Sequence, residues 1–199
     1  MSGYEKESYF FEWGGVEGVA FKEFVDNDED FTMYLSWLRN IKIIEMIGRQ
    51  EYLLAMDIDQ IKAYVKQLNI SNNDSFFKVF YRGKFIGTFK VGHIDWRLRS
   101  ADLGIMIGDL NYQKRGLSVE IMNLGIEYSF RVLGLRRLNG GCYAENIAMC
   151  KCFEACGFRL EGRKREALTL GDRYTDHILY GLLKKDIKNH NGSKKDENV

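Results

Sequence analysis

Six residues between an apolar run and a periodic helical pattern carry the clearest chemistry in the chain. Gln113-Lys114-Arg115-Gly116-Leu117-Ser118 follow the apolar run 103–107. A loop that leads from a strand into a helix aims backbone N–H groups and the positive end of the helix dipole at one point, which suits a phosphate. Gly116 lets the backbone approach a bulky anion, Ser118 keeps the adjoining wall small, and Lys114 and Arg115 add positive charge. The spacing Gln-x-x-Gly-x-Ser differs from the nucleotide-triphosphate loop and from Gly-x-Gly-x-x-Gly.

This loop resembles the acyl-CoA pyrophosphate loop of the GNAT superfamily of N-acetyltransferases, whose pattern is Gln/Arg-x-x-Gly-x-Gly/Ala. The residues that follow resemble the second half of the same family: a strand at 138–142, a short helix that starts at Asn146, and then Cys156-Gly157-Phe158. Residues 162–167 and 171–176 resemble the ribosomal-protein-acetyltransferase-like (RimJ/RimL-like) branch. The resemblance covers residues 19–185.

The resemblance implies an enzyme that moves an acetyl or another short acyl group from coenzyme A to a primary amine, without a metal. It implies that the loop backbone holds the pyrophosphate. It also implies that the preceding strand binds the pantetheine arm and points an N–H at the thioester oxygen. Asn146, which is equally natural as a helix cap, matches a family contact to the arm. The implied donor-binding residues are Met106, Ile107, Gly108, Gln113, Lys114, Arg115, Gly116, Leu117, Ser118, Asn146 and Phe153.

Phe153 departs from the family pattern. The family's general acid is a tyrosine in the element Tyr-Glu-Lys-x-Gly-Phe, and counting from Asn146 places Phe153 there. Phenylalanine cannot donate a proton. The thiolate is then protonated by water, by Tyr143 or by Tyr174, or it leaves unaided, since a thiol has a pKa of about 8.5. A weakly catalytic acyl-CoA-binding module therefore stays open as an alternative.

Two carboxylates are candidates for the general base that deprotonates the acceptor amine. Asp102 is the first candidate, because it precedes Gln113 by eleven residues. The histone-acetylating branch of the superfamily places its general-base glutamate at that separation. Glu166 is the second candidate, on the segment that approaches the acceptor in the ribosomal-protein-like branch. His93 and His177 are further groups that could assist.

The segments expected to face the acceptor are 93–102 and 159–173. They hold seven Lys or Arg residues against five acidic residues. A slightly basic site favours a diphosphate-bearing small molecule, such as a nucleotide-linked amino sugar of surface-polysaccharide synthesis. Acetylation of a protein N-terminus, such as that of a ribosomal protein, is the alternative. The candidate acceptor contacts are His93, Trp96, Arg97, Arg165 and Tyr174, of which Trp96 or Tyr174 could stack on a base.

The composition indicates a single globular domain. With 199 residues, 45% of them hydrophobic, the chain can bury one sizeable core. A formal net charge of +1 gives no general attraction to nucleic acid. No apolar run approaches the roughly 20 residues of a membrane helix, and the start of the chain lacks the pattern of a signal peptide. We therefore expect a cytoplasmic protein with neither a nucleic acid nor a membrane as partner.

Four cysteines, Cys142, Cys150, Cys152 and Cys156, lie within fifteen residues. A zinc site needs four ligands that converge on one point. Cys142 belongs to an expected strand, and only Cys152 and Cys156 share a face of the expected helix. The pattern predicts reduced, mostly buried thiols and no metal site.

These residues are distributed over alternating elements. The order predicts an α/β (α+β) protein with the GNAT fold: a mixed, largely antiparallel central sheet with helices on both faces. The expected strands are 19–24, 76–81, 85–91, 102–107, 138–142, 158–162 and 177–183, and the expected helices are 28–39, one capped by Asp57 or Asp59 that reaches 68, 117–132 and 146–156.

The acyltransferase domain is expected over residues 19–185, between an N-terminal extension at 1–18 and a polar tail at 186–199. The extension contains Tyr9, Phe10, Phe11 and Trp13 and is too apolar for a disordered arm. It could pack on the sheet edge, reach a partner subunit in a homodimer, or cover the acceptor cleft. The tail is rich in Lys, Asn and Asp, which predicts disorder.

Overall fold

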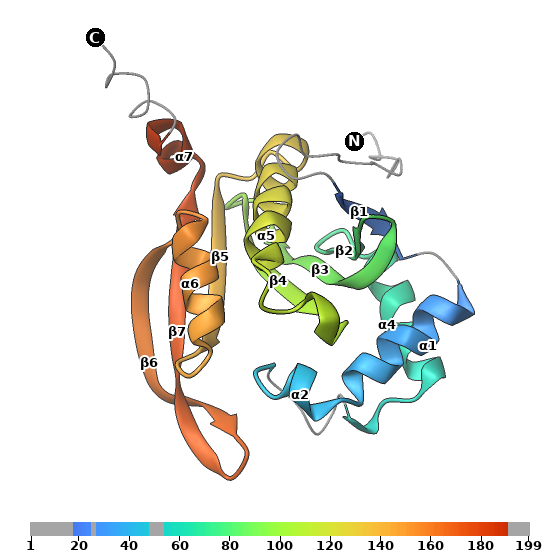
Figure 1. Ribbon diagram of the computed structural model, residues 1–199. Coiled ribbons are helices and arrows are strands. Elements are labelled where there is room, and N and C mark those ends of the chain that lie inside the picture. Colours follow the sequence, from blue (N-terminus) through green and yellow to red (C-terminus); the bar gives the residue numbers. More distant parts are fainter. Residues whose placement is uncertain (1–17, 25–26, 48–53, 191–199) are drawn as a thin grey trace.

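A seven-stranded sheet forms the centre of the protein (Figure 1). The computed structural model describes residues 18–24, 27–47 and 54–190. Most of the expected N-terminal extension and the end of the tail therefore lie outside the described residues. The strand order is β1-β2-β3-β4-β5-β7-β6, and every neighbouring pair is antiparallel except β4 with β5. The strands are β1 (Val19–Glu23), β2 (Ser75–Tyr81), β3 (Lys84–Asp95), β4 (Ser100–Ile107), β5 (Arg137–Tyr143), β6 (Arg159–Leu170) and β7 (Arg173–Leu183).

Helices cover both faces of the sheet, which confirms the predicted architecture. Local sequence sets where they begin: Asn27 caps α1, and Asp57 forms a capping box with Gln60 at the start of α4. None of the described helices has the length and apolar character needed to cross a bilayer. The helices are α1 (Asp28–Leu38), α2 (Ile41–Ile44), α4 (Ile58–Ile70), α5 (Leu117–Glu127), α6 (Ile147–Ala155) and α7 (Lys184–His190), with the 3-10 turn η1 (Leu110–Tyr112) and the π turn η2 (Tyr128–Val132).

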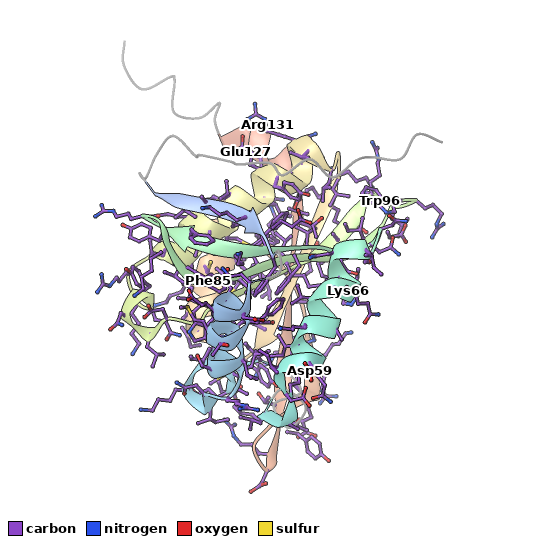
Figure 2. All side chains as sticks on the ribbon, turned by 90° about the vertical axis from the view of Figure 1, so that its right-hand side faces the viewer. Asp59, Lys66, Phe85, Trp96, Glu127 and Arg131 are labelled. Carbon is purple, nitrogen blue, oxygen red and sulfur yellow. The ribbon has the colours of Figure 1, made fainter. Side chains whose placement is uncertain are left out.

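The sheet separates two apolar cores. The core under α5 and α6 includes Phe89, Ile121 and Leu138. The core under α1 and α4 is rich in aromatic side chains; Phe85 lies there beside α1 in Figure 2. Along β4, Ala101 and Leu103 belong to the α5 core, so the residues between and after them face the other side.

The C-terminal elements extend further than the sequence predicted. Strands were expected at 158–162 and 177–183, whereas β6 and β7 form a long hairpin that projects beyond the rest of the sheet (Figure 1). Most of β6 is exposed, so backbone pairing with β7 maintains the strand instead of an apolar face. Its sequence therefore lacks the apolar alternation that would have predicted its full length. Residues 184–190 form α7, where a disordered tail was expected from 186. Lys184 anchors this helix by donating to the carbonyl of Phe130.

The parallel contact between β4 and β5 is short. It joins Ser100–Asp102 to Arg137–Asn139, and both strands continue past it without pairing to each other. The other edge of β4 is occupied by β3, and that of β5 by β7. The facing edges beyond Asp102 and Asn139 therefore border a gap in the sheet.

Candidate active site

The backbone at the start of α5 is shaped for an anion. Gly116 is the N-cap of α5 with a left-handed φ of 80°, and no side chain caps the helix. Lys114 also has a positive φ, of 59°. A Cβ built on Gly116 would meet no described atom within 4 Å, so the surface beside it is open. The N–H groups of the first turn thus face an uncovered surface with the positive end of the helix dipole behind them.

Gln113 fixes this loop to β4 instead of facing the anion surface. Its Nε2 donates to the carbonyl oxygen of Ile107 at 2.8 Å. Two cations lie by the ring of Tyr112: Arg115 Cζ is 5.5 Å from its centroid, and Lys84 Nζ, at 5.2 Å, pairs with Asp109. The loop therefore has a fixed backbone and cationic side chains at its rim.

Among the three residues proposed to meet the thioester, Ile107 alone has an N–H that faces the gap. The N–H of Gly108 donates to the Ile86 carbonyl on β3 at 2.9 Å. Successive N–H groups of a strand point to opposite edges, so that of Ile107 points away from β3. The Met106 side chain packs against the α1 core, and a Cβ on Gly108 would collide with the ring of Trp37.

The start of α6 lies at the end of β5, beside the same gap. Asn146 caps α6, and its Oδ1 accepts from the N–H of Met149 at 3.1 Å. Phe153 is a core residue with 1% exposure, and its ring contacts those of Phe158 and Tyr180. Its Cζ edge is directed at Gly140, the first residue of β5 beyond the pairing with β4. A tyrosine hydroxyl at position 153 would therefore lie over Gly140 on the α6 face of the sheet.

Asp102 is held at the point where β4 and β5 separate. Its Oδ2 lies 3.0 Å from Nδ1 of His93, and its Oδ1 accepts from Nδ2 of Asn139 at 3.1 Å. All three side chains come from neighbouring strands, because Asp102 pairs with Gly92 on one side and with Asn139 on the other. The sequence indicated Asp102 and His93 but gave no signal for Asn139, since that contact needs the pairing of β4 with β5.

Space for an acceptor lies next to this cluster. Asp102 faces away from α5, and Gly104 faces the same side two residues further along β4. No described atom lies within 4 Å of a Cβ built on Gly104. The sequence did not indicate Gly104, because the open space beside it depends on the folded structure and not on the residue types nearby.

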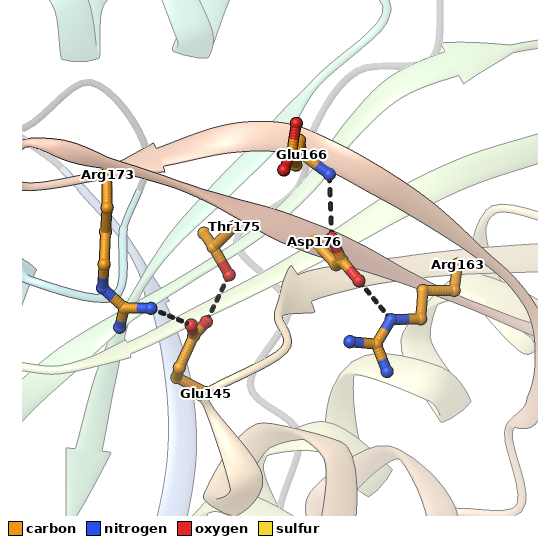
Figure 3. A network of polar contacts seen from close by, with 6 residues as sticks. All are labelled: Glu145, Arg163, Glu166, Arg173, Thr175 and Asp176. Carbon is orange, nitrogen blue, oxygen red and sulfur yellow. Dashed lines mark hydrogen bonds and ion pairs between the residues drawn. The ribbon is translucent and has the colours of Figure 1, made fainter.

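Glu166 lies in a separate polar cluster on the β6–β7 hairpin (Figure 3). It occupies a bulge with φ of 50°, and its N–H donates to Asp176 Oδ1 at 2.8 Å. That N–H, and then the Arg163 guanidinium, holds the pKa of Asp176 below its usual range. Arg165, Glu166 and Asp176 line an open cavity of about 520 Å³.

The same hairpin is tied to the turn before α6. Glu145 accepts from the Thr175 hydroxyl and from Arg173, and these bonds hold the pKa of Glu145 below its usual range. The Ala144 N–H also donates to the carbonyl of Asp176 at 3.0 Å. The cavity wall is thereby fixed beside the open end of the gap, near Asn146.

The predicted acceptor contacts fall into two groups at opposite ends of the sheet. Trp96 donates its indole N–H to the carbonyl of Asn72, beside the end of α4 (Figure 2), and Arg97 follows it in the β3–β4 loop. Tyr174 and Arg165 lie on the hairpin beyond the other end of β5. The length of β5, about 20 Å, separates the two groups. One small acceptor cannot contact both.

The basic excess counted in the sequence does not describe a free basic surface. Three of the seven cations bind carboxylates: Arg159 pairs with Asp186, Arg163 with Asp176, and Arg173 with Glu145. Asp102 and Glu166, in contrast, have no Lys or Arg partner among the described residues. These segments therefore offer a diphosphate fewer unpaired cations than the sequence count suggested.

The cysteines pack as thiols around α6. Cys142 and Cys150 have their sulfur atoms 3.5 Å apart, and burial, followed by the contact with Cys150, raises the pKa of Cys142 to about 12. All four are free thiols, and within the described chain no group of three or more His, Cys, Asp or Glu could hold a metal ion.

Comparison with known proteins identifies the family. The model of the acetyltransferase (GNAT) domain matches residues 25–179. The chain belongs to the GNAT acetyltransferase family. It is accordingly an acyl-CoA-dependent N-acetyltransferase, as the loop at 113–118 predicted.

Individual relatives in the GNAT family are distant. YnaD, an uncharacterized N-acetyltransferase of Bacillus subtilis, is 27% identical over 131 residues, which cover 64% of this chain and 75% of that protein. The spermidine N(1)-acetyltransferase of Vibrio cholerae is 31% identical over 91 residues, which cover 46% of this chain and 52% of that enzyme.

A solved structure confirms the GNAT fold. The crystal structure of spermidine N-acetyltransferase from Vibrio cholerae, in complex with CoA and spermine, superposes with a TM-score of 0.79 at 21% sequence identity. The superposition covers 87% of this chain and 100% of that one. The RimJ/RimL-like branch, the amino-sugar acceptor and the homodimer remain predictions.

Proposed function

We propose that this acetyltransferase transfers the acetyl group of acetyl-CoA to a primary amine of a small polyamine. The donor half rests on one observation: β4 and β5 separate after three paired residues, beside an α5 N-terminus that no side chain caps. An acyl-CoA has a pyrophosphate for the helix end and an amide-containing arm that can pair with a strand edge.

The donor would lie with its pyrophosphate on the N–H groups at Gly116–Ser118 and its arm in the gap. The N–H of Ile107, about 16 Å along β4 from Asp102, then pairs with the arm near its pyrophosphate end. The thioester carbon would lie close to Asp102, where the gap closes. The amine approaches from the open side next to Gly104.

The acceptor half rests on the two carboxylates without a Lys or Arg partner. Asp102 pairs with Asn139, which pairs with Gly181 of β7, and the Glu166 N–H bonds to Asp176 of the same strand. Gly181 and Asp176 are five residues apart, so about 15 Å along the strand direction separates Asp102 from Glu166. A polyamine carries several ammonium groups on a flexible chain of comparable length. One end could reach the gap while another ammonium pairs with Glu166. The similarity to a Vibrio cholerae protein named for spermidine supports this class.

A nucleotide-linked amino sugar is the second candidate. Arg165 lines the hairpin cavity, and Tyr174 on the same hairpin is 70% exposed, so a diphosphate and a base could bind there. Acetylation of a protein N-terminus is the third candidate, which the resemblance to the RimJ/RimL-like branch suggests.

An acceptor panel tests the proposal. Thiol release from acetyl-CoA should be measured with spermidine, spermine, a UDP-linked amino sugar and a peptide with a free N-terminus. We expect kcat/KM for the polyamines to exceed that for the other amines by tenfold or more. Preference for the sugar or the peptide would overturn the polyamine assignment. CoA binding without acceptor-stimulated thiol release would indicate a weakly catalytic binding module.

A further inference from the structure

We propose that His93, held by Asp102, takes the proton from the acceptor amine, so that Asp102 is a positioning residue and not the base. The inference rests on the proposed N-acetyl transfer and assigns the proton transfer within that site. Both carboxylate oxygens of Asp102 have a partner. One oxygen lies 3.0 Å from the imidazole Nδ1 of His93, and the other accepts from Asn139.

The tautomer follows from these contacts. A carboxylate can only accept, so a neutral His93 must carry its proton on Nδ1 and donate it to Asp102. Nε2 then has a lone pair, and the side chain is 79% exposed, against 53% for Asp102. Asn139 fixes the carboxylate from the opposite strand. The cluster therefore presents an oriented nitrogen base in the manner of a carboxylate–histidine pair.

The backbone of β3 departs from regular geometry to place this ring. His93 has φ of 52°, and the register shifts between Gly92, which pairs with Asp102, and Asp95, which pairs with Ser100. A bulge of this kind turns one side chain away from the alternation of its strand. A left-handed backbone at a non-glycine residue persists only where its surroundings enforce it. Here it brings the imidazole to the carboxylate at the head of the gap.

The position suits an incoming amine. Asp102 is the last β4 residue that pairs with β5, so the thioester must lie just beyond it if the arm fills the gap. Gly104, two residues along on the same face, leaves room for the acceptor. An amine in that space meets the thioester on one side and the His93–Asp102 pair on the other.

The ammonium group gives one proton to Nε2 of His93, and the neutral nitrogen attacks the thioester carbon, forming a C–N bond. The C–S bond breaks, and CoA leaves as a thiolate with the bonding electron pair. The amide nitrogen loses its second proton, which ends on the thiolate, and the imidazolium of His93 returns its proton to solvent. No oxidant, reductant or metal enters.

Two substitutions at His93 separate the base from its structural role. Asparagine tolerates a positive φ and can still donate to Asp102 but has no basic nitrogen. His93→Asn should therefore fold and bind CoA normally, while kcat with spermidine falls by about 10² to 10⁴. Glycine adopts this backbone freely and leaves Asp102 open to solvent, so His93→Gly should be equally slow and should regain activity when imidazole is added. Asp102→Asn retains the ring and should be slow without being rescued by imidazole.

Ring nitrogen chemical shifts provide a readout that needs no acceptor. In ¹⁵N spectra of the labelled protein above pH 8, Nδ1 of His93 should be protonated and Nε2 bare, and Asp102→Asn should remove this bias. The opposite tautomer would overturn the inference even if every amine of the panel fails as a substrate. With an active amine, full kcat in His93→Asn together with a loss in Asp102→Asn would return the role of base to Asp102. If the parent protein does not bind CoA, that result would instead contradict the proposed function.

Discussion

The lack of a side chain at Gly116 supports the proposed donor binding. Its φ of 80° is a conformation that most residues avoid, and the space where a Cβ would stand is open. The first-turn N–H groups of α5 consequently remain accessible from that side. A ligand phosphate can approach this backbone more closely than it could if a larger residue stood there.

Substitution of Gly116 tests the donor site. Gly116→Asp should raise the Kd for CoA at least about 100-fold, because a carboxylate would stand where the phosphates bind and because aspartate is strained at this φ. Gly116→Asn is the matched control, since asparagine has the same size, tolerates the backbone better and is neutral. Its Kd for CoA should rise about tenfold or less. Equal calorimetric affinity of both variants and the parent would place the pyrophosphate elsewhere.

Phe153 occupies a family position for a proton donor but is enclosed by other rings. Phe153→Tyr adds a hydroxyl beside Gly140 in a site with 1% exposure, and an unpaired hydroxyl there should lower the free energy of unfolding by about 1–3 kcal/mol. We expect kcat to change by less than about tenfold, because the residue at position 153 takes no part in protonating the leaving thiolate. Urea unfolding and steady-state rates check both expectations. A hundredfold gain in kcat would show that thiolate protonation limits the natural enzyme.

The two edges of strand β4 have different partners. One edge binds β3, as the bond from Gly108 to Ile86 shows, and the other faces the gap. Each residue of the strand serves one edge or the other by alternation. A change confined to the gap edge should therefore weaken donor binding and leave the sheet paired.

Proline at position 107 makes that change. Ile107→Pro removes an N–H that does not bind β3, so the protein should fold while the KM for acetyl-CoA rises about tenfold through loss of one hydrogen bond to the arm. Ile107→Ala keeps the N–H and loses the side chain, so it controls for packing. Circular dichroism and initial rates compare the two. If the alanine and proline variants have the same KM for acetyl-CoA, the Ile107 N–H does not bind the arm.

The β6–β7 hairpin is held by Asp176, whose pKa is lowered from its ordinary value of 3.8 by the Glu166 N–H and by Arg163. A carboxylate with a lowered folded-state pKa stabilises the protein above the unfolded-state value and loses that contribution as the pH falls through the folded-state value. Asp176→Asn should therefore lower the free energy of unfolding at pH 7 but have a much smaller effect near pH 2. Urea titrations at the two pH values measure the difference. A deficit that does not change with pH would assign the effect to packing.

At the scale of the whole molecule, the sequence predicted what local signals determine. Helix caps such as Asp57, periodic apolar faces and the glycine loop at 113–118 located most elements and the uncapped start of α5, which we propose as the donor site. The gap after Asp102, the contact with Asn139 and the distance from Trp96 to Tyr174 depend on which strands pair and over what length. Those pairings join residues far apart in the chain, so no sequence window contains them.

The sheet also separates the two carboxylates that the sequence offered as alternative bases. Asp102 lies at the head of the gap on β4, and Glu166 lies on the hairpin about 15 Å further along the strand direction. They cannot act on the same amine nitrogen. Asp102→Asn should lower kcat with little change in KM for spermidine, while Glu166→Gln should raise that KM and leave kcat within about threefold.

A double-mutant cycle then measures whether the two sites are independent. Because the side chains are further apart than about 10 Å and share no partner, the effects on kcat/KM should add to within about 0.5 kcal/mol. Glu166→Asp, which keeps the charge, is the matched control and should retain a KM close to that of the parent. A coupling energy above about 1 kcal/mol would mean that the hairpin closes over the gap during turnover, bringing Glu166 to the reacting amine.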